Sequence, residues 1–125
     1  MKTIRVLVLD DDKTVRESLT AYLEDMGYEA WAMVDAESAL AHLARVPADA
    51  AIVDIRLPGM NGEEFIRAAH EHWPQMVFLV YTGSPTFQSP TDIRGFKRVS
   101  KQIFVKPLSD MNLLHLEIQQ MVKKR

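Results

Sequence analysis

Four short apolar runs in this chain end in polar residues of different kinds, and this pattern constrains the fold more than any other feature. Residues 6–9 run into three carboxylates, residues 50–53 into one carboxylate, residues 79–81 into a hydroxyl, and residues 103–105 into an ammonium group. Apolar runs of this length are typical of strands buried on both faces, as in a parallel sheet. Their carboxyl ends meet at one edge of such a sheet, where open α/β sheets place their binding sites. The polar residues at these ends are Asp10, Asp11, Asp12, Asp54, Thr82 and Lys106.

The remaining sequence alternates between strand and helix patterns, which predicts right-handed βαβ units around a parallel sheet. A chain of 125 residues is long enough to form one domain, residues 1–125, with its own core. No internal repeat or low-complexity segment divides it. The apolar spacing predicts strands near residues 4–9, 29–33, 51–53, 77–81 and 103–105, and helices over about 12–26, 36–45, 62–72 and 109–123.

The residues at the four strand ends predict a specific chemistry. Neighbouring carboxylates repel one another unless a cation lies between them, and Mg²⁺ is a hard cation that prefers carboxylate oxygens. Alternatively, Asp12 caps the following helix and the other acids face water. A metal ion, a lysine, a hydroxyl and a carboxylate nucleophile are together the groups that phosphoryl transfer requires. The combination therefore favours a phosphoryl-transfer site.

With these motifs, the chain resembles the response regulator receiver domain, the phospho-acceptor module of two-component signalling, over nearly its whole length. The resemblance implies a flavodoxin-like (βα)5 fold, an α/β fold with a doubly wound parallel five-stranded sheet in the order 2-1-3-4-5. It also implies a signalling protein that is not an enzyme. Such a protein accepts a phosphoryl group from a sensor histidine kinase or a histidine phosphotransfer protein, and it signals through a partner protein.

The resemblance also assigns roles to individual residues. Asp54 matches the aspartate that is phosphorylated. Asp11 matches a direct Mg²⁺ ligand, Asp10 an acid that reaches the metal through water, and Arg56 a residue whose backbone carbonyl ligates the metal. The residues matching those that bind the phosphoryl oxygens are Thr82 and Lys106, and the bond from this lysine to Pro107 is typically cis in the family.

The segment between the hydroxyl and the lysine departs from the family pattern. Receivers carry an alanine-rich fourth helix here, whereas this chain has Pro85, Pro90 and Gly95, which oppose a long helix. We expect a short helix over about residues 90–96 at most.

The aromatic switch residue of the family, three positions before the lysine, is Ile103 in this chain. Phe104 follows it, but adjacent strand residues point to opposite faces, so Phe104 is not a simple replacement. We therefore expect the usual aromatic rotation to be absent or reduced, and phosphorylation to reorder residues 83–101 instead.

Residues 83–101 are also locally basic, because they contain two arginines and two lysines against one acid, Asp92. A charge run of this kind most often means a solvated loop. The alternative is a docking surface for an acidic partner within residues 83–105. The basic residues are Arg94, Lys97, Arg98 and Lys101.

Two other functions fit part of the sequence. Residues 6–14 also match the opening motif of haloacid-dehalogenase-like phosphatases, with Asp10 as the nucleophile and Asp12 as the general acid. That interpretation leaves Asp54 unexplained and lacks the acidic pair expected after Lys106. The second alternative is a receiver-like module that binds partners without phosphorylation, which the isoleucine at the switch position favours.

Composition limits the location and the partners. The chain has no cysteine, so a disulfide framework and thiol chemistry are excluded. No apolar run approaches the roughly 20 residues of a membrane span, and the first predicted strand leaves no room for a signal peptide. A net charge of −2 gives no general attraction to nucleic acid. We therefore expect a cytoplasmic protein with no direct membrane or nucleic-acid contact.

Overall fold

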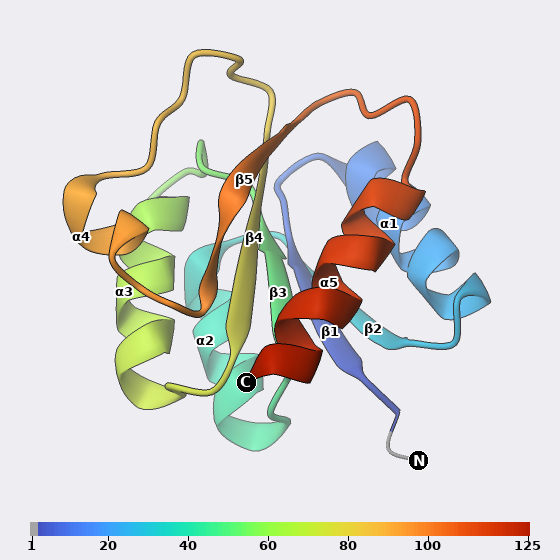
Figure 1. Cartoon of the computed structure of the whole chain (residues 1–125), viewed down its shortest axis with the longest axis horizontal. Helices are drawn as coiled ribbons and strands as arrows, with labels where there is room; N and C mark the ends of the chain where they lie inside the picture. The colour runs from blue at the N-terminus through green and yellow to red at the C-terminus, as the bar shows by residue number, and fades with distance from the viewer. Residues whose placement is uncertain (1–2) are drawn as a thin grey trace.

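The computed structural model describes residues 3–125, which form one five-stranded parallel sheet with helices on both faces (Figure 1). The strand order β2-β1-β3-β4-β5 confirms the predicted flavodoxin-like topology. No helix in this range is long and apolar enough to cross a membrane. In chain order the elements are β1 (Arg5–Leu9), α1 (Lys13–Asp25), β2 (Glu29–Met33), α2 (Ala36–Arg45), β3 (Ala50–Val53), α3 (Gly62–His72), β4 (Val77–Thr82), α4 (Thr91–Arg94), β5 (Val99–Val105) and α5 (Asn112–Lys124).

The central strands divide their side chains between two cores, one on each face of the sheet. On β1, Leu7 and Leu9 pack with residues of α2 and α3, whereas Val6 and Val8 pack with residues of α1 and α5. All four are fully buried, and burial of each such side chain contributes roughly 1.5–3 kcal/mol. Because both faces of the sheet are covered, the strands have continuous apolar runs instead of alternating polar and apolar residues.

Polar side chains start the helices that follow the strands. Asp12 caps α1, since its carboxylate accepts hydrogen bonds from the backbone N–H groups of Thr14 and Val15 at 2.8 and 3.3 Å. This contact confirms the capping interpretation of Asp12. After α1, Gly27 has a φ of +93°, in the left-handed region that ends many helices. Met26, which helical spacing predicts to be buried, is instead 40% exposed.

The part of the chain that departs from the family pattern contains the shortest helix. Helix α4 spans only four residues, as the prolines and Gly95 predict. Strand β5 is longer than predicted, because it begins at Val99. Between the pairs Phe78–Val99 and Val80–Ile103, one residue of β4 faces three residues of β5. The extra residues form a bulge. Their polar side chains interrupt the apolar run and hide the start of the strand in the sequence.

Helix α5 begins three residues later than predicted, at Asn112. The carboxylate of Asp110 accepts a hydrogen bond from the Asn112 N–H at 3.0 Å, so residue 110 lies in a turn before the helix. Sequence spacing alone does not distinguish this turn from a first helical turn.

Candidate functional site

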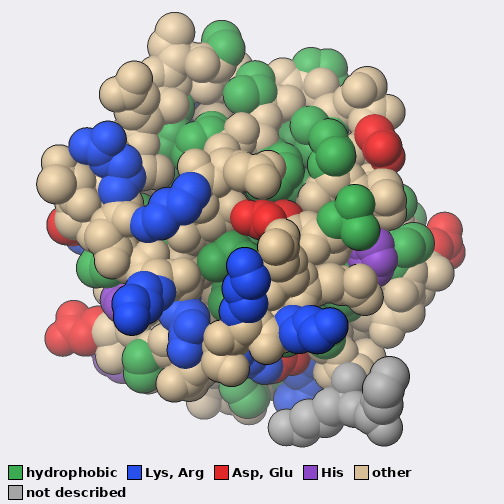
Figure 2. Space-filling view, viewed as in Figure 1, with side chains coloured by type: hydrophobic (Ala, Val, Ile, Leu, Met, Phe, Trp, Pro, Cys, Tyr) green, Lys and Arg blue, Asp and Glu red, His purple; other side chains and the backbone are tan. Residues whose placement is uncertain are grey.

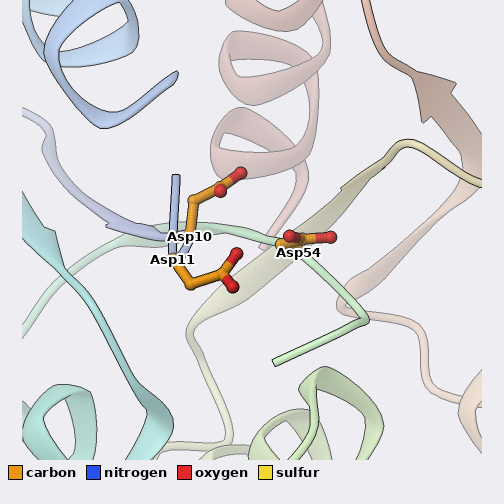
Figure 3. Close-up of side chains that lie close together, drawn as sticks. All are labelled: Asp10, Asp11 and Asp54. Carbon is orange, nitrogen blue, oxygen red and sulfur yellow. The ribbon is translucent and has the colours of Figure 1, made fainter. Parts of the chain in front are cut away.

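The polar residues at the strand ends lie together at the carboxyl edge of the sheet. Asp10 and Asp11 follow β1, and Asp54 follows the neighbouring strand β3. One carboxylate oxygen from each of these three residues lies within 4.8 Å of the others. Figure 3 shows the three side chains projecting to the same side of the strand ends. The sheet topology brings residues 44 positions apart into one acidic cluster.

Lys106 joins two of these carboxylates. Its ammonium nitrogen lies 2.6 Å from Oδ2 of Asp10 and 3.3 Å from Oδ2 of Asp54. Asp10 is 2% exposed and Asp54 is 6% exposed, so both contacts are made largely out of water. With all four groups ionised, three carboxylates and one ammonium leave a surplus of two negative charges.

The shared pocket changes the proton affinity of two groups. Burial, followed by repulsion from the Asp10 carboxylate, raises the pKa of Asp54 above its ordinary value even though Lys106 opposes the shift. Burial lowers the pKa of Lys106, but its hydrogen bonds and charge interactions with Asp10 and Asp54 outweigh this effect and raise it. The raised pKa keeps Lys106 protonated, whereas the raised pKa of Asp54 means that its carboxylate loses a proton less readily than an ordinary aspartate.

Backbone and arginine contacts fix the position of Asp10. The backbone N–H of Asp12 donates to its carboxylate at 2.9 Å, and the Arg16 guanidinium donates to its backbone carbonyl at 2.9 Å. Arg16 was not among the predicted site residues. The available signal was its position one helical turn after Asp12, which places it over the end of β1.

The acidic cluster opens into a cavity of about 490 Å³ that contains the other predicted site residues. Arg56, Thr82 and Lys106 line this cavity together with Asp11 and Asp54. Thr82 is 1% exposed, and its hydroxyl accepts a hydrogen bond from the Ser84 N–H at 3.2 Å. The bond from Lys106 to Pro107 is cis, as the family resemblance implies.

Ile103, at the switch position, and its neighbour Phe104 lie on opposite faces of the sheet. Ile103 packs against the core on the α2 and α3 side, whereas Phe104 belongs to the core on the α1 and α5 side. This arrangement confirms that Phe104 does not take the place of the family's aromatic residue. On the α2 and α3 side of the sheet, the position three residues before Lys106 therefore carries an aliphatic side chain.

Comparison with known proteins identifies the family. Residues 6–118 match the model of the response regulator receiver domain. The match covers most of the chain, which therefore belongs to this family. The family assignment, and the capping contacts of Asp12, count against the phosphatase alternative, in which Asp12 is the general acid.

Individual relatives agree with this assignment. The chain is 30% identical to the response regulator protein FleR of Pseudomonas aeruginosa over 112 residues, which is 90% of this chain and 23% of FleR. It is 32% identical to the transcriptional regulatory protein FixJ of Azorhizobium caulinodans over 116 residues, which is 90% of this chain and 53% of FixJ. The chain thus spans only part of the length of these regulators.

Solved structures share the fold. The chemotaxis protein CheY4 of Vibrio cholerae is 25% identical with a TM-score of 0.82, covering 96% of this chain and 99% of that one. The protein TrrA of Thermotoga maritima, solved in complex with Mg²⁺ and BeF, is 24% identical with a TM-score of 0.83, covering 95% of this chain and 99% of that one. At that identity, the likeness to TrrA establishes the fold alone.

Proposed function

We propose that this receiver domain accepts a phosphoryl group on Asp54 from a phosphohistidine of a sensor histidine kinase or a histidine phosphotransfer protein. The observation that carries the proposal is the convergence of Asp10, Asp11, Asp54 and Lys106 at one sheet edge, beside a cavity that also contains Thr82. The protein acts as a signalling phospho-acceptor, and it promotes only its own phosphorylation and dephosphorylation.

In the transfer step, a carboxylate oxygen of Asp54 donates an electron pair to phosphorus. A P–O bond forms as the P–N bond of the phosphohistidine breaks. The electron pair of the P–N bond stays on the imidazole nitrogen, which takes up a proton from water. Lys106 already contacts the Asp54 carboxylate, so its ammonium group lies where it can pair with an oxygen of the incoming phosphoryl group. The hydroxyl of Thr82 donates to a second phosphoryl oxygen.

The acidic cluster fits a divalent cation. Its donors are carboxylate oxygens within 4.8 Å of one another, and the surplus of two negative charges matches the charge of Mg²⁺. We assign Asp11, Asp54 and the backbone carbonyl of Arg56 as direct ligands and Asp10 as a ligand through water. When bound, Mg²⁺ supplies positive charge that reduces the repulsion between the carboxylates and a phosphoryl group.

The modified residue can be identified directly. Incubation with acetyl phosphate and Mg²⁺ should add one phosphoryl group, measured by intact mass, and Asp54→Asn should abolish the addition. Persistence of the label in Asp54→Asn together with its loss in Asp10→Asn would support the phosphatase alternative. If the wild type accepts no label from acetyl phosphate, from phosphoramidate or from any kinase, the module that binds partners without phosphorylation becomes the better proposal.

The proposed signal passes through the segment after Thr82. Ile103 has no aromatic ring to rotate, and residues 83–90 form an extended loop between β4 and the short α4 (Figure 1). Loops with few buried contacts are natural two-state elements of a fold. We therefore propose that phosphorylation mainly reorders residues 83–101, and that a partner protein docks within residues 83–105.

Amide hydrogen exchange tests this route. Beryllofluoride, an acyl-phosphate mimic, should change exchange mainly in residues 83–101 when Mg²⁺ is present. Changes confined to residues 54–62, with residues 83–101 unaffected, would contradict the proposed route.

A further inference from the structure

A second cavity, of about 600 Å³, adjoins the cavity that contains Asp54 and Lys106. The two cavities have four lining residues in common, so a molecule that occupies the first can extend into the second. The second cavity lies between the β3–α3 loop and the β4–α4 loop. The residues common to both cavities are Asp11, Arg56, Thr82 and Ser84.

The part of the second cavity that lies outside the first is largely apolar. Its walls are Ile55, Leu57, Pro58 and Phe87, which we call the side pocket, and two polar residues at the start of α3 complete the lining. Figure 2 shows hydrophobic side chains at the top of the molecule, where Figure 1 draws the β4–α4 loop, whereas Lys and Arg side chains lie lower, over α4 and β5. Apolar walls with a few polar groups are typical of a small-ligand site.

The ring of Phe87 is held in place beside Thr82. It is half-buried and packs against the core on the α2 and α3 side of the sheet. The Phe87 N–H donates to the Ser84 carbonyl at 3.3 Å, and the Ser84 N–H donates to the Thr82 hydroxyl at 3.2 Å. These contacts hold residues 84–87 in a turn, so the ring enters the side pocket with little freedom to move away.

The leaving group of a phosphoryl donor passes close to the side pocket. In-line transfer places this group on the side of phosphorus opposite the attacking oxygen of Asp54. Lys106 and Thr82 occupy positions beside the phosphoryl oxygens, so the leaving group points out of the first cavity. Because Arg56 and Ser84 line both cavities, the side pocket adjoins that exit.

We propose that the side pocket is a leaving-group subsite, in which the Phe87 ring stacks on the imidazole of a phosphohistidine donor. This inference deepens the proposed function and rests on it. As an oxygen of Asp54 bonds to phosphorus, the P–N bond breaks, and its electron pair stays on the imidazole nitrogen, which takes up a proton from water. An aromatic contact of this kind changes a binding or rate constant by roughly tenfold at most.

The experiment compares two donors with a P–N bond, phosphoimidazole and phosphoramidate, whose leaving groups are imidazole and ammonia. Phosphoryl uptake by the full chain with Mg²⁺, followed by intact mass, gives the ratio of the two rates. Phe87→Ala should lower this ratio about fivefold, mainly by slowing uptake from phosphoimidazole, whereas Phe87→Tyr keeps the ring and should keep the ratio. Phe96→Ala is the matched control, because Phe96 is half-buried against the same core but lines neither cavity.

A second measurement requires no transfer. In an NMR titration of the amide signals with Mg²⁺ present, benzylphosphonate should bind about fivefold more tightly than methylphosphonate, and Phe87→Ala should remove the difference. Phosphoryl uptake with equal rate ratios in the wild type and Phe87→Ala, or an equal fall in Phe96→Ala, refutes the side pocket and leaves the proposed function intact. Absence of uptake from both donors contradicts the proposed function. The phosphonates then decide alone: a ring preference that depends on Phe87 supports the side pocket, and equal binding refutes it.

Discussion

Gly62, the first residue of α3, gives a sharp test of how the fold positions Asp54, the proposed phospho-acceptor. A Cβ atom at this position would lie 2.2 Å from the backbone oxygen of Asp54 and 2.8 Å from the Cα atom of Ile55. The Gly62 N–H also donates to the Ile55 carbonyl at 3.0 Å, which holds the helix start against the end of β3. Gly62→Ala must therefore displace the backbone of Asp54 itself.

The size of the effect follows from two opposing contributions. Restoring an ordinary contact of 3.4 Å requires the Asp54 oxygen and the new methyl group to separate by roughly 1.2 Å more. Overpacking of this kind costs about 1–3 kcal/mol, and a backbone atom cannot rotate away as a side chain can. Alanine is a better helix former than glycine by at most about 1 kcal/mol. We expect Gly62→Ala to lower the free energy of unfolding by about 2 kcal/mol.

Urea unfolding measures this change as a lower midpoint with an unchanged slope. Gly83→Ala is the matched control, because a Cβ atom at Gly83 meets nothing within 4 Å. It should change the stability by less than about 0.5 kcal/mol. Gly62→Ala should also slow the phosphorylation of Asp54 by acetyl phosphate. If Gly62→Ala is as stable as Gly83→Ala, the predicted steric conflict between a methyl group at position 62 and the Asp54 backbone is wrong.

The remaining predictions concern the metal, the end of α5 and the response to high pH. Mg²⁺ at tenfold its Kd should stabilise the fold by about 1.4 kcal/mol, and Asp11→Ala should remove most of the resulting Tm shift in a thermal melt; an equal shift in both proteins would argue against this ligand. Arg125→Ala removes the contacts of the guanidinium with the Asp49 carboxylate and with the backbone carbonyls of Asp49 and Gln75. The free energy of unfolding in urea should therefore fall by at most about 1 kcal/mol, and by less in high salt. Burial, followed by the charge of Tyr22, raises the pKa of Tyr28 to about 12. This shift contributes stability that is fully present below the unfolded-state pKa of 10.0 and is lost as pH rises from about 10 to 12. Tyr28→Phe, followed by absorbance titration and urea unfolding, should remove this pH-dependent loss of stability.

The sequence was sufficient to predict the sheet and the cluster at its edge. Strands buried on both faces have continuous apolar runs, and parallel strands place their carboxyl ends together, so the positions of Asp10, Asp54, Thr82 and Lys106 followed from the topology. The Lys106 contacts with both Asp10 and Asp54 did not follow. They depend on side-chain rotamers and on distances of a few ångströms.

The irregular segment was only partly predictable. Pro85, Pro90 and Gly95 correctly indicated a short fourth helix, because each opposes helical backbone geometry. The bulge at the start of β5 was missed, since its inserted residues are polar and interrupt the strand pattern.

The buried charges at the edge of the sheet explain why we expect this site to respond to a bound cation and to phosphorylation. Asp10 and Asp54 are nearly inaccessible to water, and Lys106 compensates only part of their charge. Removing one partner from a buried ion pair usually destabilises a protein by several kcal/mol, so the lysine is needed for the fold itself. The remaining negative charge destabilises the folded state, and a bound cation reduces this destabilisation. A change in the charge of Asp54 alters how Lys106 and the other carboxylates interact. Since the backbone N–H of Lys106 donates to the Thr82 carbonyl at 2.8 Å, this redistribution acts directly on the carboxyl ends of β4 and β5.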